Sequence, residues 1–394
     1  MLYLLLFFCA PFISNYYENP ELTPLVRVLG LTVVISGVKN VQQAYISRTM
    51  QFRKFFITSL AGVLAAAVIS IAMALNDFGI WALIAQKVIN LAVATVLMWL
   101  TVNWRPKLMF SWNRLKGLIS YGWKLLVSSL IDTVYRELSK LIIGKRYSET
   151  DLAYYNQGNQ YPNLIAININ TAIDSVIFPV MSQEQNDPQR VKAMTRRAMK
   201  TGIYIMAPLM MGLAFTAPNV VSLILTDKWL PCVPFMCIFC ITFMFYPLHT
   251  TNLNAIKAMG RSDLFLKLEI LKKLVGVVLL LASMWHSVMA MAYSMIISSL
   301  ASQIINSFPN KKLLNYGYIE QLKDILPSIL LAVFMGGCVY FIGYSSLPVF
   351  IELALQIIAG AAIYIAGSIV TKNESFGYMF DIVKSFLSKK KKVN

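Results

Sequence analysis

The sequence is a succession of apolar runs about 20 residues long, separated by short polar connections. Twelve such runs can be placed, near residues 2–17, 22–46, 55–75, 80–102, 117–143, 155–181, 201–225, 231–258, 264–285, 288–308, 323–344 and 347–371. A helix needs about 20 apolar residues to cross a bilayer, and 57% of the 394 residues are hydrophobic while 13% are charged. We therefore expect an all-α, polytopic membrane protein with about 12 transmembrane helices, and no large domain outside the membrane.

The basic residues of the connections indicate which loops face the cytoplasm. The chain has 35 Lys and Arg against 18 Asp and Glu, a net charge of +17. If every second connection is taken as one set, that set contains 24 basic residues. The other set of connections contains only three, which are Lys145, Arg146 and Lys228. Positively charged loops stay in the cytoplasm, so we expect both termini there. The cations cluster between apolar runs and not along one polar face, so no nucleic-acid partner is expected.

A weak internal repeat divides the chain. An Ala-Pro pair followed by a further proline occurs twice with a common offset of 207 residues, at Ala10, Pro11 and Pro24 and again at Ala217, Pro218 and Pro231. The offset covers an even number of helices, so the two copies have the same orientation, as in transporters built from parallel repeats. The pattern predicts two pseudo-symmetric lobes.

The repeat also predicts the domain boundaries. We expect an N-terminal lobe of four helices at residues 1–116, a C-terminal lobe of six helices at residues 117–308, and a final helix pair with a basic cytoplasmic tail at residues 309–394. The second copy has two helices before its Ala-Pro pair, whereas the first copy has none. Two N-terminal helices are therefore expected to be missing from the first lobe.

Several segments resemble one family across almost the whole chain. They are FCAPFISNYYENPELTPLVRVLGL, RTMQFRKFF, DFGIWALIAQKVI, LIIGKRYSETDLAYYNQ, IFPVMSQEQNDPQRV and NAIKAMGRSD. These segments resemble the polysaccharide export family of the multidrug/oligosaccharidyl-lipid/polysaccharide superfamily. The resemblance implies a fold of fourteen helices, of which this chain corresponds to helices three to fourteen. It departs from the family at Ser139, where an aspartate is usual.

The resemblance implies a function as well. Such proteins are flippases that move undecaprenyl-pyrophosphate-linked oligosaccharides, the repeat units of O-antigen, capsule or exopolysaccharide, across the bacterial inner membrane. The implied partners are this lipid-linked oligosaccharide, membrane lipids, and the polysaccharide polymerase and glycosyltransferases of the same pathway.

Charged residues within the apolar runs are the candidate site residues, because each costs about 2.5 to 3.5 kcal/mol in the hydrocarbon and needs a cavity or a partner. The run 117–143 carries five of them, Lys124, Asp132, Arg136, Glu137 and Lys140. Three of these, Asp132, Arg136 and Lys140, are spaced i, i+4, i+8 and lie within a stripe of about 80° on the helix. We expect this stripe to face the space between the lobes.

The stripe suggests two kinds of role. Arg136 and Lys140 suit the pyrophosphate of a lipid-linked glycan, because guanidinium and ammonium groups pair with phosphate oxygens. Asp132 is a candidate for binding a coupling cation. The alternative is that Asp132 with Arg136, and Glu137 with Lys140, are structural ion pairs. That alternative is open for Asp132, whereas a functional role is favoured for the two cations.

Other charged positions complete the candidate set. Arg27, Lys39 and Lys124 are expected to add to a cationic cavity, and Glu137 and Asp174 join Asp132 as ion-coupling candidates. Three further charged residues, Glu269, Lys272 and Lys273, lie near an interior helix end, where long side chains usually extend to the surface. The two histidines, His249 and His286, lack metal-ligand spacing, so no metal is expected.

No phosphate-binding GxxxxGK[ST] motif occurs, so ATP is not the expected energy source. No cofactor is expected, and a gradient of Na⁺ or H⁺ is the default for an alternating-access flippase. Three alternative functions are compatible with parts of the sequence. A glycan polymerase or glycosyltransferase, hence an enzyme, needs a sizeable exterior loop, but the longest spans about residues 144–154. A drug or cation exporter of the same superfamily conflicts with the basic excess. An inactive, truncated product is the third.

Overall fold

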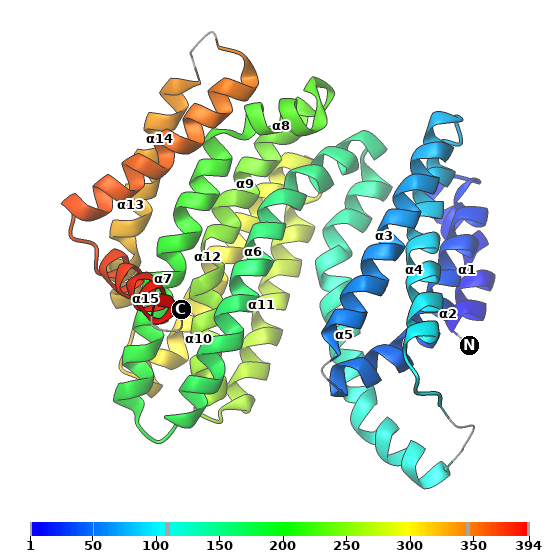
Figure 1. Cartoon of the computed structure of the whole chain (residues 1–394), viewed down its shortest axis with the longest axis horizontal. Helices are drawn as coiled ribbons and strands as arrows, with labels where there is room; N and C mark the ends of the chain where they lie inside the picture. The colour runs from blue at the N-terminus through cyan, green and yellow to red at the C-terminus, as the bar shows by residue number, and fades with distance from the viewer. Residues whose placement is uncertain (1, 50, 107–110, 344–346, 392–394) are drawn as a thin grey trace. The chain divides into compact units, whose positions relative to one another are not determined.

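The protein is all-helical throughout the described residues of this computed structural model. These are residues 2–49, 51–106, 111–343 and 347–391, with some side chains left out, among them those of Lys124 and Asp132. The elements (Figure 1) are α1 (Leu2–Tyr17), α2 (Leu22–Arg48), α3 (Phe52–Leu75), α4 (Ile80–Thr101), α5 (Trp112–Arg146), α6 (Glu149–Gln183), α7 (Pro188–Phe215), α8 (Ala217–Leu225), the 3₁₀ turn η1 (Asp227–Cys232), α9 (Val233–Met244), α10 (Tyr246–Ala258), α11 (Ser262–Ser283), α12 (Val288–Leu313), α13 (Tyr318–Ile342), α14 (Val349–Val370) and α15 (Glu374–Lys391). Each of the twelve expected spans coincides with a helix or with a helix interrupted by a turn, which confirms the expected fold class.

Among the described residues, eight segments are long and apolar enough to cross a membrane. They are Leu22–Ile46, Arg53–Leu75, Ile80–Thr101, Pro188–Phe215, Asp227–Ala258, Val288–Leu313, Tyr318–Ile342 and Val349–Val370. Of the other expected spans, α1 is shorter, and α5, α6 and α11 carry more polar residues. The protein is therefore a multi-pass membrane protein, and three of its long helices, α5, α6 and α11, are not among the eight apolar segments.

Prolines interrupt two of the expected spans. The run 201–225 is divided between α7 and α8, and Pro218 lies in the first turn of α8. The run 231–258 is divided into η1, α9 and α10, with Pro234 and Pro247 in the first turns of the two α-helices. Proline lacks the backbone N–H of a helix interior but is tolerated in a first turn. A new helix therefore starts at each of these prolines.

The chain forms two compact units, residues 1–128 and 129–394. In the first unit α3 packs along α4, and α2 contacts both α1 and α4. In the second unit α7 contacts α6, α9, α10 and α13, while α11 packs on α12. The division lies within α5, so this helix contributes residues to both units.

Buried aromatic and methionine side chains form the core of the second unit. Tyr155 of α6 makes edge contacts with Phe235 and Phe239 of α9, at centroid distances of 5.9 and 5.2 Å. Gly158 allows this close approach, because a Cβ there would lie 2.6 Å from the Cβ of Phe235. Such a rigid core holds the surrounding helices, including those that carry the site, in fixed register.

Local capping fixes where two of these helices begin. Ser148 and Asp151 form a reciprocal capping box at α6, in which the Ser148 hydroxyl accepts from the backbone N–H of Asp151 at 3.0 Å. Asp187 accepts from the backbone N–H groups of Gln189 and Arg190 at the start of α7. These caps satisfy N–H groups that a helix start leaves without partners.

Candidate functional site

A polar pocket of about 460 Å³ lies within the second unit, among α5, α9, α10, α11 and α12. We call it the Arg136 pocket. Its lining residues are Tyr135, Arg136, Thr242, Phe243, Tyr246, His249, Thr250, Leu253, Glu269, Lys272, Lys273, Met295, Ser298, Ser299 and Ser302. The helices α5 and α11, which are not among the eight apolar spans, supply all of the Lys, Arg and Glu residues of the pocket.

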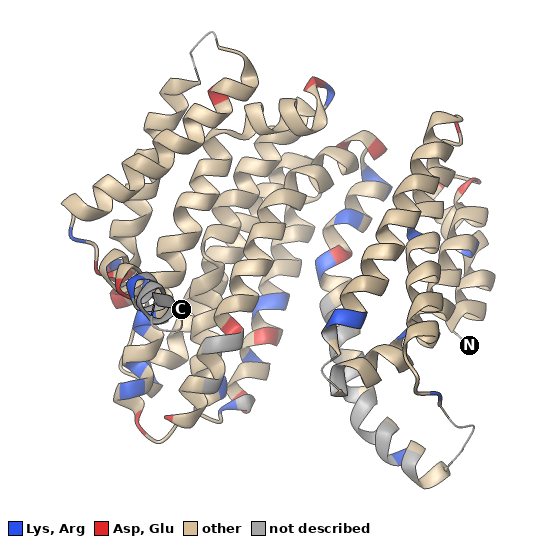
Figure 2. Cartoon of the chain, viewed as in Figure 1, with Lys and Arg blue, Asp and Glu red and all other residues tan. Residues whose placement is uncertain are grey.

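Small residues allow these helices to approach each other. Gly276 on α11 faces Tyr135 of α5, and a Cβ at Gly276 would overlap the tyrosine hydroxyl. The glycine therefore leaves room for the Tyr135 side chain, which lines the pocket together with the neighbouring Arg136. Figure 2 shows several charged residues in the last turns of α5.

The pocket carries an excess of positive charge. Its cations are Arg136, Lys272 and Lys273, and its carboxylate is Glu269. Lys272 Nζ lies 2.6 Å from Glu269 Oε1, and this pair is largely buried, with side-chain exposures of 14% and 25%. Three cations and one carboxylate leave two net positive charges. In a partly desolvated site this excess favours an anionic ligand.

His249 belongs to a hydrogen-bonded chain at the pocket wall. The amide Nδ2 of Asn306 lies 3.2 Å from Nδ1 of His249, and Nε2 lies 3.3 Å from the Ser299 hydroxyl. An amide nitrogen can only donate, so Nδ1 accepts and Nε2 carries the ring hydrogen. The Ser299 hydroxyl in turn donates to the carbonyl of Thr242. The histidine is therefore neutral in this network and orients a hydroxyl at the pocket.

Hydroxyl groups complete the wall. Ser298, Ser299 and Ser302 lie on one face of α12, and Thr242 and Thr250 come from α9 and α10. Hydroxyls both donate and accept hydrogen bonds, as do the hydroxyls of a sugar. The arrangement offers cations for phosphate and hydroxyls for saccharide in one cavity.

The predicted residues of α5 differ in their surroundings. Arg136 lines the pocket, whereas Lys140 forms an ion pair of 2.8 Å with Glu137. This is the structural pair considered as an alternative from the sequence. Ser139, at the position where the family usually has an aspartate, is buried near the Tyr155 side chain. The side chains of Lys124 and Asp132 lie outside the described part of the structure, so their roles stay predictions.

Asp174 lies on α6 and accepts a hydrogen bond of 2.5 Å from the Asn254 amide of α10. One turn before it on α6, Asn170 accepts a hydrogen bond from Thr250, a residue of the Arg136 pocket. Asp174 is therefore connected to the pocket through two neighbouring polar contacts between the same two helices. Its assignment as an ion-coupling residue stays a prediction.

Two predicted cations lie in the first unit. Arg27 stacks over Phe7, with its guanidinium carbon 4.3 Å from the ring centroid, and its Nε lies 3.4 Å from the Phe7 carbonyl oxygen. Lys39 lines a second pocket of about 450 Å³ together with Lys87 and Asn90. This pocket has two cations and no acid among its described lining residues. Arg27 thus binds a neighbouring helix, whereas Lys39 faces an open polar space.

Sequence reasoning missed three charged residues of the Arg136 pocket. Glu269, Lys272 and Lys273 were expected to extend from a helix end, but Lys272 lies ten residues beyond Ser262, about 15 Å along the helix. Two features of the sequence indicate that these residues lie within the span. One is this distance from the helix start, and the other is the i, i+3 spacing of Glu269 and Lys272, which allows an ion pair.

Comparison with known proteins agrees with this fold. A profile of the family described as polysaccharide biosynthesis protein matches residues 1–234. The chain belongs to this family. The solved structure of the lipid II flippase MurJ, in its inward closed conformation, matches with a TM-score of 0.76 and 14% identity, over 94% of this chain and 80% of that one. At this identity the likeness shows a shared fold.

Three curated relatives carry related names. The teichuronic acid biosynthesis protein TuaB of Bacillus subtilis (strain 168) is 23% identical over 93% of this chain and 77% of its own length. The lipopolysaccharide biosynthesis protein WzxC of Escherichia coli (strain K12) is 23% identical over 82% of this chain. The succinoglycan biosynthesis transport protein ExoT of Rhizobium meliloti (strain 1021) is 24% identical over 58%. The chain spans 64% of WzxC and 46% of ExoT.

Proposed function

We propose that this protein is a flippase that moves an undecaprenyl-pyrophosphate-linked oligosaccharide from the cytoplasmic to the periplasmic leaflet of the bacterial inner membrane. The oligosaccharide is a repeat unit of O-antigen, capsule or exopolysaccharide. Both termini are proposed to lie in the cytoplasm, and a polymerase and glycosyltransferases of the same pathway are the proposed partners.

The observation that carries this proposal is the composition of the Arg136 pocket. It combines a net positive charge with hydroxyls of three helices, which suits the pyrophosphate and the sugar of one ligand. The family and the flippase fold support transport. The names of the relatives describe biosynthesis and transport proteins, so the comparisons support a transporter and not an enzyme.

Each charged residue has a proposed part. Arg136 and Lys273 contact the pyrophosphate, while Lys272 exchanges its ion pair with Glu269 for a phosphate oxygen. Arg27, Lys39, Lys124 and Lys140 provide further positive charge along the path. A gradient of Na⁺ or H⁺ supplies the energy, with Asp132, Glu137 and Asp174 as candidate coupling residues. Protonation or ion binding at a carboxylate would change the local charge that holds the substrate.

The test is transport by purified protein in proteoliposomes. The probe is undecaprenyl-pyrophosphate-linked oligosaccharide, and its arrival in the outer leaflet is followed with a membrane-impermeant glycosidase. Arg136→Gln is expected to lower the initial rate by about tenfold, the loss expected for one charge-assisted hydrogen bond of about 1.5 kcal/mol. Lys272→Gln should have an effect of similar size.

Two controls separate substrate binding from folding. Lys267→Gln removes an exposed cation of the same helix α11 and should keep the wild-type rate. The double variant Glu269→Gln and Lys272→Gln removes both members of the ion pair, so it leaves no unpaired carboxylate in the pocket. A lower transport rate of this double variant shows that the Lys272 cation itself is needed. Wild-type rates for Arg136→Gln and for the double variant would refute the pocket as the substrate path.

A further inference from the structure

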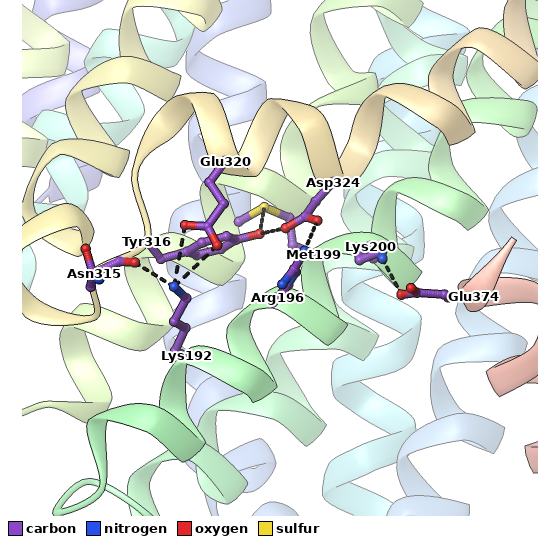
Figure 3. A network of polar contacts seen from close by, with 9 residues as sticks. All are labelled: Lys192, Arg196, Met199, Lys200, Asn315, Tyr316, Glu320, Asp324 and Glu374. Atoms are coloured by element: carbon purple, nitrogen blue, oxygen red, sulfur yellow. Dashed lines mark hydrogen bonds and ion pairs between the residues drawn. The ribbon is translucent and has the colours of Figure 1, made fainter.

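A ladder of ion pairs connects α7 to α13 and α15 (Figure 3). Lys192, Arg196 and Lys200 are spaced i, i+4, i+8 and lie on one stripe of α7. Their respective acidic partners are Glu320 at 3.3 Å, Asp324 at 2.6 Å, and Glu374 in a short contact. The first two acids belong to α13 and the third to the first turn of α15.

The ion pair between Arg196 and Asp324 is reinforced by a further hydrogen bond. The carboxylate of Asp324 is 6% exposed, and besides Arg196 it accepts a hydrogen bond of 2.8 Å from the hydroxyl of Tyr316. Lys192 is held as well, because its ammonium also donates to the carbonyl oxygen of Asn315 at 2.6 Å. These contacts hold α7 and α13 together.

The third pair differs from the other two. The side chain of Glu374 is 81% exposed, whereas that of Lys200 is 19% exposed. Lys200 is therefore a largely buried cation that forms an ion pair with a solvent-exposed carboxylate on a separate helix. An exposed carboxylate gains little from such a pair because water and salt compete for both charges. Another anion could take its place.

A pocket of about 300 Å³ lies at this third pair, between α7 and the first turn of α15. We call it the α7–α15 pocket. Its cations are Arg196, Arg197 and Lys200, and its hydroxyls are those of Thr201, Ser375 and Tyr378. At about 30 Å³ for each water, the space corresponds to about ten water molecules. It is large enough for a phosphate group.

The charges of the α7–α15 pocket favour an anion. Glu374 is the carboxylate among its lining residues, against three cations. Arg196 is already paired with Asp324, but Arg197 stacks over the ring of Tyr378 at 4.0 Å. No ion pair of Arg197 occurs among the described residues. A stacked guanidinium keeps its N–H groups free for an oxyanion.

The position of the pocket brings it to the depth of lipid headgroups. The candidate span Pro188–Phe215 carries all of its Lys and Arg residues in the turns up to Lys200, and the charged end of a membrane helix usually lies at the headgroup level. The apolar helix α14 ends at Val370, and α15 begins four residues later. Anionic headgroups concentrate at this level and attract basic residues.

We propose that the α7–α15 pocket binds a phosphate group on Arg197 and Lys200, and that the Glu374 carboxylate competes with this ligand for Lys200. The proposal is independent of the proposed transport function, because it concerns a different pocket and a different measurement. The phosphate belongs either to an anionic phospholipid or to a soluble phosphate compound.

The experiment measures binding to the purified full chain in detergent. The two probes are short-chain phosphatidylglycerol and inorganic phosphate, and bound ligand is counted by native mass spectrometry and by calorimetry. Glu374→Gln removes the competing carboxylate, and it should lower the dissociation constant by about fivefold, the scale of an exposed ion pair. Arg197→Gln should raise the dissociation constant by a similar factor.

The matched control is Lys384→Gln, an exposed cation of α15 outside the pocket, which should bind like the wild type. Binding of both probes indicates recognition of the phosphate group alone, whereas binding of phosphatidylglycerol alone indicates a lipid headgroup. The proposal is overturned if neither probe binds, or if Glu374→Gln and Arg197→Gln bind with wild-type constants. Equal weakening by Lys384→Gln would show only general charge attraction and would also overturn it.

Discussion

At the scale of single residues, the Glu374 carboxylate responds to pH. The Lys200 ammonium beside it lowers the pKa of this carboxyl below its ordinary value of 4.5, with a smaller contribution from Arg196. A carboxyl whose pKa is lowered in the folded state stabilises that state above its ordinary pKa, and the stabilisation is lost as pH falls through the lowered value. The ion pair of Glu374 therefore contributes to the contact between α15 and α7 at neutral pH, and this contribution is lost as pH falls through the lowered pKa.

We predict that α15 becomes less firmly held on α7 in acid. Spin labels at the exposed positions Gln189 and Lys384 should give one narrow distance distribution from pH 7 to about pH 5, and a broader one below the lowered pKa. Glu374→Gln removes the titrating group, so its distribution should not change between pH 7 and acid. A wild-type distribution that stays narrow in acid, or a Glu374→Gln variant that keeps the wild-type pH dependence, would contradict the prediction.

The sequence predicted some site residues and missed others for a physical reason. Arg136 was expected to face a cavity because a charge deep in an apolar run needs water or a partner, and it does line a pocket. For His249 the sequence indicated only that it lacks metal-ligand spacing, and its hydrogen bond with the Ser299 hydroxyl at the pocket was not predicted. Helical spacing shows which side chains share a face, but the neighbour that a buried polar group meets depends on the tertiary packing.

At the scale of elements, α13 offers a test of helix packing. Gly336 lies against the ring of Phe215 at the end of α7, and an added Cβ would overlap that ring. The next residue, Gly337, has no heavy atom within 4 Å of the position of an added Cβ. Two adjacent glycines of one helix thus differ in whether they contact α7.

We predict opposite effects of alanine at these two positions. Gly336→Ala should lower the free energy of unfolding by about 1 to 3 kcal/mol, the usual cost of overpacking. Gly337→Ala should leave it unchanged or raise it by up to about 1 kcal/mol, because alanine favours a helix. Denaturant unfolding in detergent measures both. Equal losses would show that glycine acts through backbone flexibility and not through contact with Phe215.

The apolar runs of the sequence predicted where the helices lie, but they did not predict where a proline breaks a run into two helices. The apolar run 231–258 was expected as one span, but it consists of η1, α9 and α10. Hydropathy averages over a window and does not detect a local break, whereas Pro234 and Pro247 mark where the new helices start. The two Ala-Pro pairs of the internal repeat also differ in local structure, because Pro11 lies inside α1 whereas Pro218 lies in the first turn of α8. The alanines of both pairs, Ala10 and Ala217, are fully buried.

At the scale of the whole molecule, family and fold agree with the prediction from the sequence. The chain belongs to the polysaccharide biosynthesis protein family and shares the fold of a lipid II flippase. The expected lobes, the coupling ion and the identity of the glycan stay predictions. They depend on the arrangement of the two units and on a bound substrate, neither of which the order of apolar runs determines.

The central claim is that the substrate occupies the Arg136 pocket. A photoreactive p-benzoylphenylalanine replacing Ser302, which lines the pocket, should capture undecaprenyl-pyrophosphate-linked oligosaccharide in membranes. The control position is Ile270 of α11, an exposed apolar side chain outside the pocket lining. The account predicts a glycolipid adduct at position 302, its loss when Arg136→Gln is added, and little adduct at position 270. Equal capture at both positions, or capture that persists without Arg136, would contradict it.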